Sequence, residues 1–297
     1  MAQRRITLTG PFDVAATFET LAGKAAGRVS ADRTVAWWVT SAPTGPASLR
    51  VEVSRGEVCA EAWGDGADWV IDRLPDLCGL GDDPARLAPA PGIVAQLHRR
   101  NPGLRLGASG RVFETLVPAI LGQRVTSIEA RRAYRGLLGA YGSPAPGPLV
   151  AMVPPDAATV ARLRYADLHP FGVERSRAEV LIEAARCAKR LEEIVTMEPA
   201  AAVARLTTVR GVGPWTAAIV MGAACGDPDA VPVGDYHLPH TVAWALAAEP
   251  RATDERMLEL LEPYRGQRRR VLVLLGRAGF HAPRFGPRTS PRDIAWS

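Results

Sequence analysis

The chain has 297 residues and 47% hydrophobic content, which is enough for one large domain or two ordinary domains with buried cores. No stretch approaches 18 uncharged apolar residues, and no apolar run of signal length follows the first arginines, so we expect a cytoplasmic protein without a membrane span. The formal net charge is +5, and only two of the 36 basic residues are lysine. Because no C-x-x-C pair occurs among Cys59, Cys78, Cys187 and Cys225, the sequence argues against an iron–sulfur cluster or a zinc ribbon.

The first 90 residues combine strand-like and helix-like patterns. Apolar and polar residues alternate in several runs, and Arg55-Gly56 divides the last run into a predicted β-hairpin. The strand patterns cover residues 4–10, 35–41 and 48–63, and the helical patterns cover residues 12–23 and 67–80. Strands with helices over one face predict a small antiparallel sheet domain of the α+β class over residues 1–90.

Proline and glycine punctuate residues 87–110, and the strong patterns that follow are helical. The clearest is an apolar stripe at helical spacing, made by Phe113, Leu116, Val117, Ile120 and Leu121. We therefore predict an all-helical domain over residues 91–282 and an Arg/Pro-rich, loosely ordered tail over residues 283–297.

Positive charge is concentrated in two segments. Residues 96–136 contain eight arginines and two acidic residues, and residues 264–297 contain eight arginines and one acidic residue. Local charge density of this kind suits a polyanion such as a nucleic acid, although solvated helix faces would give the same composition.

Residues 208–217, TVRGVGPWTA, interrupt a helical region. Pro214 suits the first turn of a helix, so the segment predicts a helix, a tight glycine turn and a second helix. Gly211 and Gly213 can adopt positive φ, and they leave backbone N–H groups open beside the positive end of a helix dipole, which suits a phosphate. An ordinary helix–turn–helix corner would need the same glycines.

Asp235 follows Trp215 by 20 residues, in a loop rich in valine, proline and glycine that opens the next helical pattern. A carboxylate in this place can act as a catalytic group, but an aspartate before a helix is also a common N-cap.

Together these motifs resemble the helix-hairpin-helix (HhH-GPD) DNA glycosylase superfamily, and they look most like its 3-methyladenine DNA glycosylase II (AlkA-like) branch. The resemblance runs from Pro102 to Leu275 through PGLRL, FETLVPAILGQRVT, LHPFGVERSRAEVLIEAA, LTTVRGVGPWTAAIV and VPVGDYHL, in the order and approximate spacing of that branch. It implies a TATA-binding-protein-like sheet domain before the helical domain. It also implies base excision repair by a monomer on double-stranded DNA that contains a damaged base.

The resemblance assigns the chemistry to Asp235, whose carboxylate would stabilise positive charge on the deoxyribose while the flipped-out base leaves. Trp215 matches the pocket tryptophan, where strand-cutting relatives carry a Schiff-base lysine, so the resemblance implies a hydrolase without lyase activity. An aromatic face would attract a cationic alkylated base. We therefore expect excision of an alkylated purine at the nucleoid, with no required cofactor.

Further positions carry over from the family. Gln123 matches a residue near the gap left by the base, and Arg124 falls where the branch inserts an apolar wedge into the DNA. The carbonyls of Thr207, Val209 and Gly211 match those that hold a monovalent cation, Na⁺ or K⁺, beside a DNA phosphate. The candidates for DNA contact are Thr208, Gly211, Val212, Gly213 and Thr216. Three aromatic residues could provide replacement aromatic surface in the base pocket or could be core residues: Tyr236, Phe113 and Trp38.

Two positions differ from the pattern of the branch and bear on which lesion the protein would recognise. Ile219 and Val273 stand near positions where the branch has a tyrosine and a tryptophan in its pocket. The alternatives are a glycosylase for uracil, hypoxanthine or oxidised guanine, and a non-catalytic protein that binds DNA damage through the hairpin.

Overall fold

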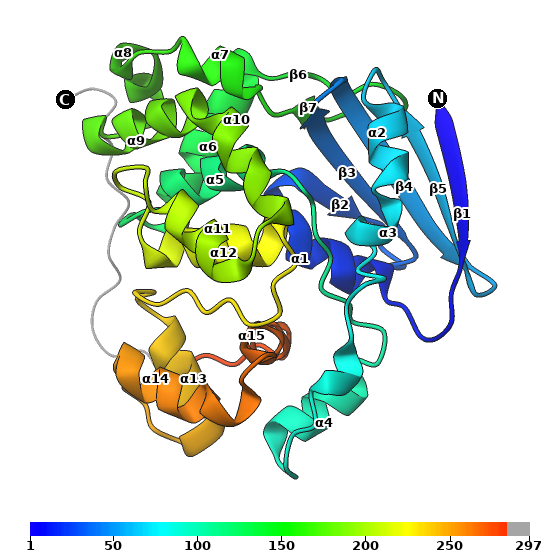
Figure 1. The fold of residues 1–297 in the computed structure, drawn as a ribbon, viewed down its shortest axis with the longest axis vertical. Coiled ribbons are helices and arrows are strands. Elements are labelled where there is room, and N and C mark those ends of the chain that lie inside the picture. Colours follow the sequence, from blue (N-terminus) through cyan, green and yellow to red (C-terminus); the bar gives the residue numbers. More distant parts are fainter. Residues whose placement is uncertain (284–297) are drawn as a thin grey trace.

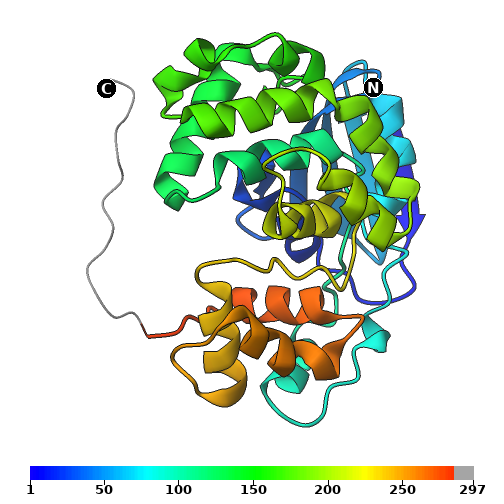
Figure 2. The ribbon, with the colours of Figure 1, turned by 60° about the vertical axis from the view of Figure 1, so that its left-hand side comes forward.

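The computed structural model describes residues 1–283, apart from the side chains of residues 22–28. The predicted tail therefore lies almost entirely outside the described residues. The described chain forms three groups of elements, each with its own cluster of buried side chains: an antiparallel sheet with its helices, a large middle group of helices, and a smaller helical group (Figures 1 and 2).

The sheet is five-stranded and antiparallel, in the order β1-β5-β4-β3-β2. Its strands are β1 (Ala2–Thr7), β2 (Gly27–Val29), β3 (Val35–Ala42), β4 (Gly45–Ser54) and β5 (Glu57–Trp63). Arg55 and Gly56 both have positive φ, at 53° and 79°, as the predicted two-residue hairpin requires. Trp38 is buried in the core, while Trp37 stacks on Trp63 with ring centroids 5.7 Å apart.

Helices α1 (Val14–Ala26), α2 (Ala67–Asp72) and α3 (Leu74–Leu77) share one buried cluster with the sheet. The helix predicted over residues 67–80 is broken at Arg73, because Pro75 has no N–H to continue the hydrogen-bonding of α2 and instead lies in the first turn of α3.

The middle group is built around α5 (Val112–Leu121), whose Leu116 and Ile120 are completely buried. Glu192 fixes the start of α5, since its carboxylate oxygens accept the backbone N–H groups of Val112 at 2.9 Å and Phe113 at 3.0 Å. The other helices are α6 (Ser127–Tyr141), α7 (Ala157–Ala161), α8 (Tyr165–Leu168), α9 (Arg175–Arg186), α10 (Ala188–Glu192), α11 (Pro199–Leu206) and α12 (Pro214–Ala224), with a short pair of strands, β6 (Ser143–Pro144) and β7 (Met152–Val153).

The third group brings together helices that are far apart in the sequence. Helix α4 (Ile93–Arg100) packs with α13 (Leu238–Ala247), α14 (Asp254–Leu261) and α15 (Arg268–Arg277), as the lower part of Figure 1 shows. Short 3₁₀ segments lie at Pro84–Arg86, His169–Phe171, Glu193–Thr196 and Glu262–Tyr264. The predicted fold class, an α+β sheet domain followed by a helical domain, is confirmed. The boundary at residue 90 stays a prediction.

Candidate functional site

The turn between α11 and α12 depends on glycine at one position. Gly211 has φ of 93°, and a Cβ atom built there would lie 2.3 Å from Cγ2 of Val180 on α9. Gly213 has φ of −96° with extended backbone, and no atom would lie within 4 Å of its Cβ. The sequence indicated that both glycines could adopt positive φ, but only Gly211 does so. Gly211 shapes the turn, while Gly213 leaves open space in front of α12.

Gln123 joins the end of α5 to this turn. Its Nε2 donates hydrogen bonds of 2.9 Å to the carbonyl of Gly211 and to Oγ1 of Thr216. Thr216 is 2% exposed, so its hydroxyl serves this internal contact. The predicted residue Gln123 thus reaches the hairpin, where it holds the turn in place against α5.

The outer surface of the hairpin is formed by Thr207, Thr208 and Gly211, which are exposed, whereas Val209 and Val212 are buried. The carbonyl of Val209 accepts the N–H of Val212 at 2.9 Å, and the carbonyl of Gly211 accepts Gln123. A carbonyl oxygen has two lone pairs, so each of these two oxygens retains one for a cation.

Arg124 is exposed in the connection between α5 and α6, and its φ is 54°. A non-glycine residue with left-handed backbone costs roughly 1 kcal/mol or more, and such strain is common at binding sites. The next helix begins with a capping box between Thr126 and Glu129. Arg124 therefore projects from a tightly defined corner two residues before a well-capped helix.

The two residues at the centre of the prediction are in direct contact. Nε1 of Trp215 donates a hydrogen bond of 3.0 Å to Oδ2 of Asp235. Oδ1 of Asp235 accepts the backbone N–H groups of His237 at 2.8 Å and Leu238 at 2.9 Å. Asp235 is not itself the N-cap of α13, which is His237, but one of its oxygens binds the N–H groups of His237 and Leu238 at the start of the helix while the other meets Trp215.

A cavity of about 860 Å³ opens beside Trp215. Trp215, Ala218, Ile219 and Ala223 of α12 form one wall, because residues three, four, seven and eight apart share a helix face. The opposite wall comes from α15, with Leu272, Val273 and Gly276, and Trp38 of β3 adds an aromatic edge. Its size is within the range of small-molecule sites in proteins.

Of the predicted aromatic residues, Trp215 and Trp38 line the cavity, and the others lie elsewhere. Phe113 is 3% exposed in the core of the middle group, and Tyr236 is 77% exposed, with its ring packed against His237 and His240. Neither lines the cavity, and Gln123 does not line it either.

Six charged cavity residues were not predicted from the sequence: Glu19, Arg33, Arg111, Glu114, Arg269 and Arg277. Glu114 accepts hydrogen bonds from Oγ1 of Thr40 at 2.7 Å and from the N–H of Ser41 at 3.2 Å, which ties α5 to β3. Burial raises the pKa of the Glu114 carboxyl above its usual value. No local motif could have identified these residues, because the cavity forms where α1, α5, α12 and α15 meet.

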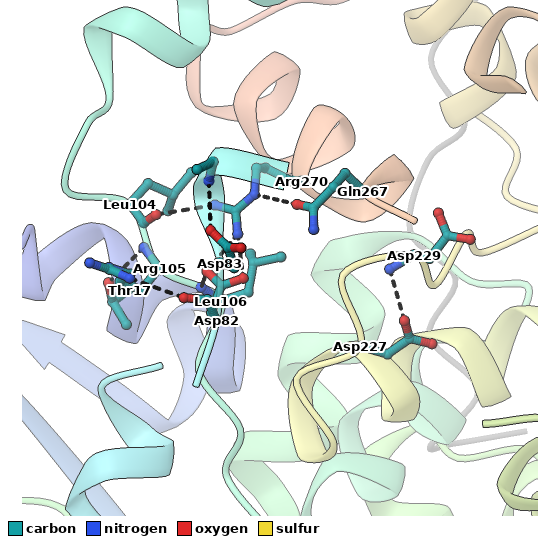
Figure 3. Close-up of polar contacts among 11 residues, drawn as sticks. Thr17, Asp82, Asp83, Leu104, Arg105, Leu106, Asp227, Asp229, Gln267 and Arg270 are labelled. Carbon is teal, nitrogen blue, oxygen red and sulfur yellow. Dashed lines mark hydrogen bonds and ion pairs between the residues drawn. The ribbon is translucent and has the colours of Figure 1, made fainter. Parts of the chain in front are cut away.

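The start of α15 is bound on two sides. Arg270 is buried and forms a two-oxygen ion pair with Asp82 (Figure 3). Arg270 also donates to Oε1 of Gln267 at 2.7 Å and to the carbonyl of Leu104 at 3.1 Å. Arg268 pairs with Asp229, in the loop that leads to Asp235, and the N–H of Arg269 donates to the carbonyl of Pro228 at 2.9 Å. These contacts fix α15 against both the sheet domain and the loop.

The two basic segments differ in where their arginines point. In the first, Arg99, Arg100, Arg124, Arg131, Arg132 and Arg135 are exposed. In the second, Arg268 and Arg270 pair with buried or half-buried carboxylates, and Arg269 lines the cavity. Among the described residues of the two segments, the exposed arginines therefore lie mainly on α4, α6 and the α5–α6 corner, together with Arg265 of the second segment.

Within residues 1–283 no helix has the length and apolar character needed to cross a bilayer. The same described residues contain no group of three or more histidine, cysteine, aspartate or glutamate side chains arranged to hold a metal ion, and the four cysteines are free thiols.

Comparison with known proteins gives a family match over half of the chain. The profile of the family described as "HhH-GPD superfamily base excision DNA repair protein" matches residues 117–265. A DNA-3-methyladenine glycosylase of Bacillus subtilis (strain 168) is 26% identical over 185 residues, which cover 60% of this chain and 61% of the relative. The chain thus matches less than two thirds of the length of that relative.

Solved structures with the same fold include a 3-methyladenine DNA-glycosylase from Archaeoglobus fulgidus, with a TM-score of 0.74 and 20% identity over 93% of this chain and 99% of that one. An 8-oxoguanine glycosylase/lyase of Clostridium acetobutylicum has a TM-score of 0.71 and 13% identity over 93% and 96% of the two chains. At these identities the structures show the fold alone. The family match and the names of the relatives confirm the predicted resemblance, and the chain belongs to the HhH-GPD superfamily of base excision DNA repair proteins, on its AlkA-like side.

Proposed function

We propose that this protein is a monofunctional DNA glycosylase, which hydrolyses the N-glycosidic bond of a damaged base flipped out of duplex DNA. The observation that carries the proposal is the hydrogen bond between Trp215 and Asp235 beside the 860 Å³ cavity. An aromatic wall for a base and a carboxylate for its sugar are thereby joined at one point. The family match supports a role in base excision repair, and we propose that the protein acts there as a monomer on chromosomal DNA.

In the proposed reaction the bond between the base and C1′ of deoxyribose lengthens, and positive charge develops on the sugar. The carboxylate of Asp235 stabilises that charge electrostatically. Water adds to C1′, the base leaves with the bonding electrons and a proton, and an abasic site remains. The three hydrogen bonds to Asp235 hold its carboxylate in one orientation before the substrate arrives.

The absence of a lyase step is supported by the side chain at position 215. A Schiff base with the sugar requires an amine, and an indole cannot form one. Among the described residues that line the cavity there is no lysine.

For DNA binding, the hairpin supplies the open backbone around Gly211 and Gly213, and the carbonyls of Thr207, Val209 and Gly211 would share a Na⁺ or K⁺ ion with a phosphate. Thr208, Val212 and Thr216 belong to the same hairpin. Val212 and Thr216 are buried and support it from inside. Arg124, at its strained corner, is suited to fill the gap left by the base, because a guanidinium plane can stack on a base and also pair with a phosphate. The exposed arginines of α6 extend this positive surface.

Two observations bear on the lesion. The printed names of the relatives and the electron-rich face of Trp215 support an alkylated purine. Arg269, which lines the cavity and has an unpartnered Nη1 among the described residues, supports a neutral base instead, such as hypoxanthine, oxidised guanine or uracil.

The proposal is tested by incubating the full chain with duplexes that each contain one lesion, and by measuring released base and strand cleavage before and after hot alkali. We expect strand breaks only after alkali, and no covalent protein–DNA product on borohydride reduction. Strand cleavage without alkali, together with borohydride trapping, would contradict the monofunctional mechanism. Tight binding to an abasic-site analogue with no turnover on any lesion would replace it with a non-catalytic damage-binding role.

A further inference from the structure

Arg269 is the charged side chain at the far end of the cavity wall. It lies on α15 and packs against α12, where a Cβ atom built on Gly222 would be 2.4 Å from Nε of Arg269. Gly222 is seven residues from Trp215, so the two lie on one face of α12, roughly 10 Å apart along its axis. The side chain of Arg269 therefore lines the cavity about two helical turns from Trp215.

The guanidinium of Arg269 is incompletely satisfied. Its Nη2 donates to the carbonyl of Thr20 on α1 at 3.1 Å, whereas Nη1 is shielded from solvent and has no hydrogen-bond partner among the residues that the structure describes. Its neighbours Arg268 and Arg270 each pair with a carboxylate, Asp229 and Asp82 respectively. Arg269 has no such ion pair within the described part of the chain. Unpaired buried donors are costly, and they are a common sign of a missing ligand.

The charge on Arg269 persists at neutral pH. Burial lowers the pKa of its guanidinium to about 10, which is still well above 7. The group is therefore a cation that faces the cavity, and one of its nitrogens lacks an acceptor.

The other arginines that line the cavity are paired with carboxylates. Arg33 and Arg277 pair with Glu19, and Arg277 also lies 3.7 Å from Asp13. Arg111 lies 3.9 Å from both Glu114 and Glu192. Of the four arginines that line the cavity, Arg269 is therefore the one without an ion pair among the described residues, and its charge would repel a base that carries a positive charge.

We propose that Arg269 selects a neutral purine with a keto oxygen and an adjacent ring-nitrogen acceptor on its edge, and that it disfavours the cationic N-alkylated purines. Arginine donates hydrogen bonds to the O6 and N7 acceptors of guanine in this way, and here Nη1 would be the donor while Nη2 stays on Thr20. Stacking on Trp215 would direct the far edge of the base toward Gly222 and Arg269. A bicyclic purine extends further along this wall than a pyrimidine.

Binding requires the guanidinium to turn about its bond to Thr20, so that Nη1 reaches the base. This inference rests on the proposed glycosylase activity, and it changes the expected substrate from an alkylated purine to hypoxanthine or a related keto-purine. In a purely structural alternative, Arg269 serves only to link α15 to α1.

The test compares two purines on otherwise identical duplexes, one with hypoxanthine and one with 7-methylguanine, which is cationic and has no N7 acceptor. Single-turnover excision rates are divided by the spontaneous rate of base loss for each lesion. Duplexes with 8-oxoguanine and uracil complete the panel. We expect a greater acceleration for hypoxanthine than for 7-methylguanine, and a greater acceleration than for uracil.

Three variants separate charge from hydrogen bonding. Arg269→Met should slow hypoxanthine excision by roughly 10- to 100-fold and leave 7-methylguanine excision unchanged or faster, because one charged hydrogen bond is lost together with the repulsion. Arg269→Lys keeps the charge without the planar fork, so it should slow hypoxanthine excision and still disfavour 7-methylguanine. Arg265→Met is the matched control, since Arg265 is 69% exposed at its side chain and pairs only with Glu262 among the described residues.

The outcomes distinguish this inference from the proposed function. If the wild type releases no base from any duplex, the glycosylase proposal fails and the inference fails with it. If the wild type accelerates 7-methylguanine loss most, or if Arg269→Met lowers all rates by the same factor, the glycosylase proposal stands and the selective role of Arg269 is wrong. Thermal unfolding of each variant shows whether a uniform loss of excision rate comes from instability. If it does for Arg269→Met, the excision rates of Arg269→Lys on the two purines decide whether Arg269 is selective.

Discussion

The indole Nε1 of Trp215 donates a hydrogen bond of 3.0 Å to Oδ2 of Asp235, across 20 residues of sequence. The other carboxylate oxygen is held by two backbone N–H groups at the start of α13. The geometry of the carboxylate is therefore set by a helix end and an aromatic side chain together. A change in the tryptophan should affect the chemistry of the aspartate as well as the wall of the cavity.

Trp215→Phe retains an aromatic wall and removes the indole N–H. We expect single-turnover excision to fall by roughly 10-fold, because a hydrogen bond to a charged acceptor is lost while stacking is kept. Trp244→Phe is the control, since Trp244 is 37% exposed on α13 and outside the cavity. Equal rates for Trp215→Phe and the wild type would mean that the hydrogen bond does not position the carboxylate.

Gly211→Ala and Gly213→Ala form a matched pair within one hairpin. Gly211 has φ of 93° and close contact with Val180, so alanine there should lower the free energy of unfolding by roughly 2 to 4 kcal/mol. Gly213 has ordinary backbone and open space, so alanine there should cost less than about 1 kcal/mol. Chemical denaturation measures both values.

The same pair separates folding from DNA binding. A methyl group on Gly213 would stand in front of α12, where a phosphate is expected, so Gly213→Ala should weaken DNA binding without a matching loss of stability. If Gly213→Ala binds DNA as tightly as the wild type, the hairpin does not meet the backbone at this residue.

The sequence was sufficient to predict the features that depend on neighbouring residues. The hairpin at Arg55-Gly56 and the turn at Gly211 follow from the backbone freedom of glycine, and Pro214 begins α12 as predicted. The family resemblance assigned Trp215 and Asp235 to one site, but the hydrogen bond between them was not predicted. The break at Arg73 was missed because a strong apolar pattern outweighed the effect of Pro75.

The cavity could not be predicted in the same way. Its charged residues come from helices that are up to 258 residues apart, such as those of Glu19 and Arg277, and their roles depend on tertiary packing. Three consecutive arginines at residues 268–270 are equivalent in the sequence, yet one lines the cavity and two form ion pairs. Tyr236 was predicted as replacement aromatic surface for the base pocket, but its side chain lies in solvent.

Gly222→Ala tests the contact between α12 and Arg269 without altering any charge. The added methyl group would meet Nε of Arg269 at 2.4 Å and Cδ at 2.9 Å, so the side chain must move. We expect slower excision of a keto-purine, similar to Arg269→Met, with the fold retained. Gly139→Ala in α6 is the control, because no atom would lie within 4 Å of its Cβ, and it should raise stability by about 0.5 to 1 kcal/mol with unchanged excision.

Asp229→Asn tests the anchor at the start of α15 through its pH dependence. Burial alone would raise the pKa of Asp229, but the hydrogen bonds and charge of Arg268 lower it below its usual value. A lowered carboxyl pKa contributes stability above the unfolded-state pKa of about 3.9, and this contribution is lost as pH falls through the folded-state value.

We therefore expect Asp229→Asn to lower the free energy of unfolding at pH 7 by about 1 to 3 kcal/mol, and this difference from the wild type should shrink below about pH 4. Urea denaturation at several pH values measures it. A difference that stays constant from pH 7 to pH 3 would show that the Asp229 charge is not the source of the stability.

The most direct test of the account is the rate of base release by Asp235→Asn, compared with Asp156→Asn. Asn caps a helix about as well as Asp, so both variants should fold, and Asp156 caps α7 with a bond of 2.7 Å to the N–H of Thr159 without lining the cavity. We predict that Asp235→Asn loses at least roughly 100-fold in single-turnover excision on the best lesion in the panel, whereas Asp156→Asn keeps the wild-type rate. Equal excision by Asp235→Asn and the wild type would contradict the proposed mechanism.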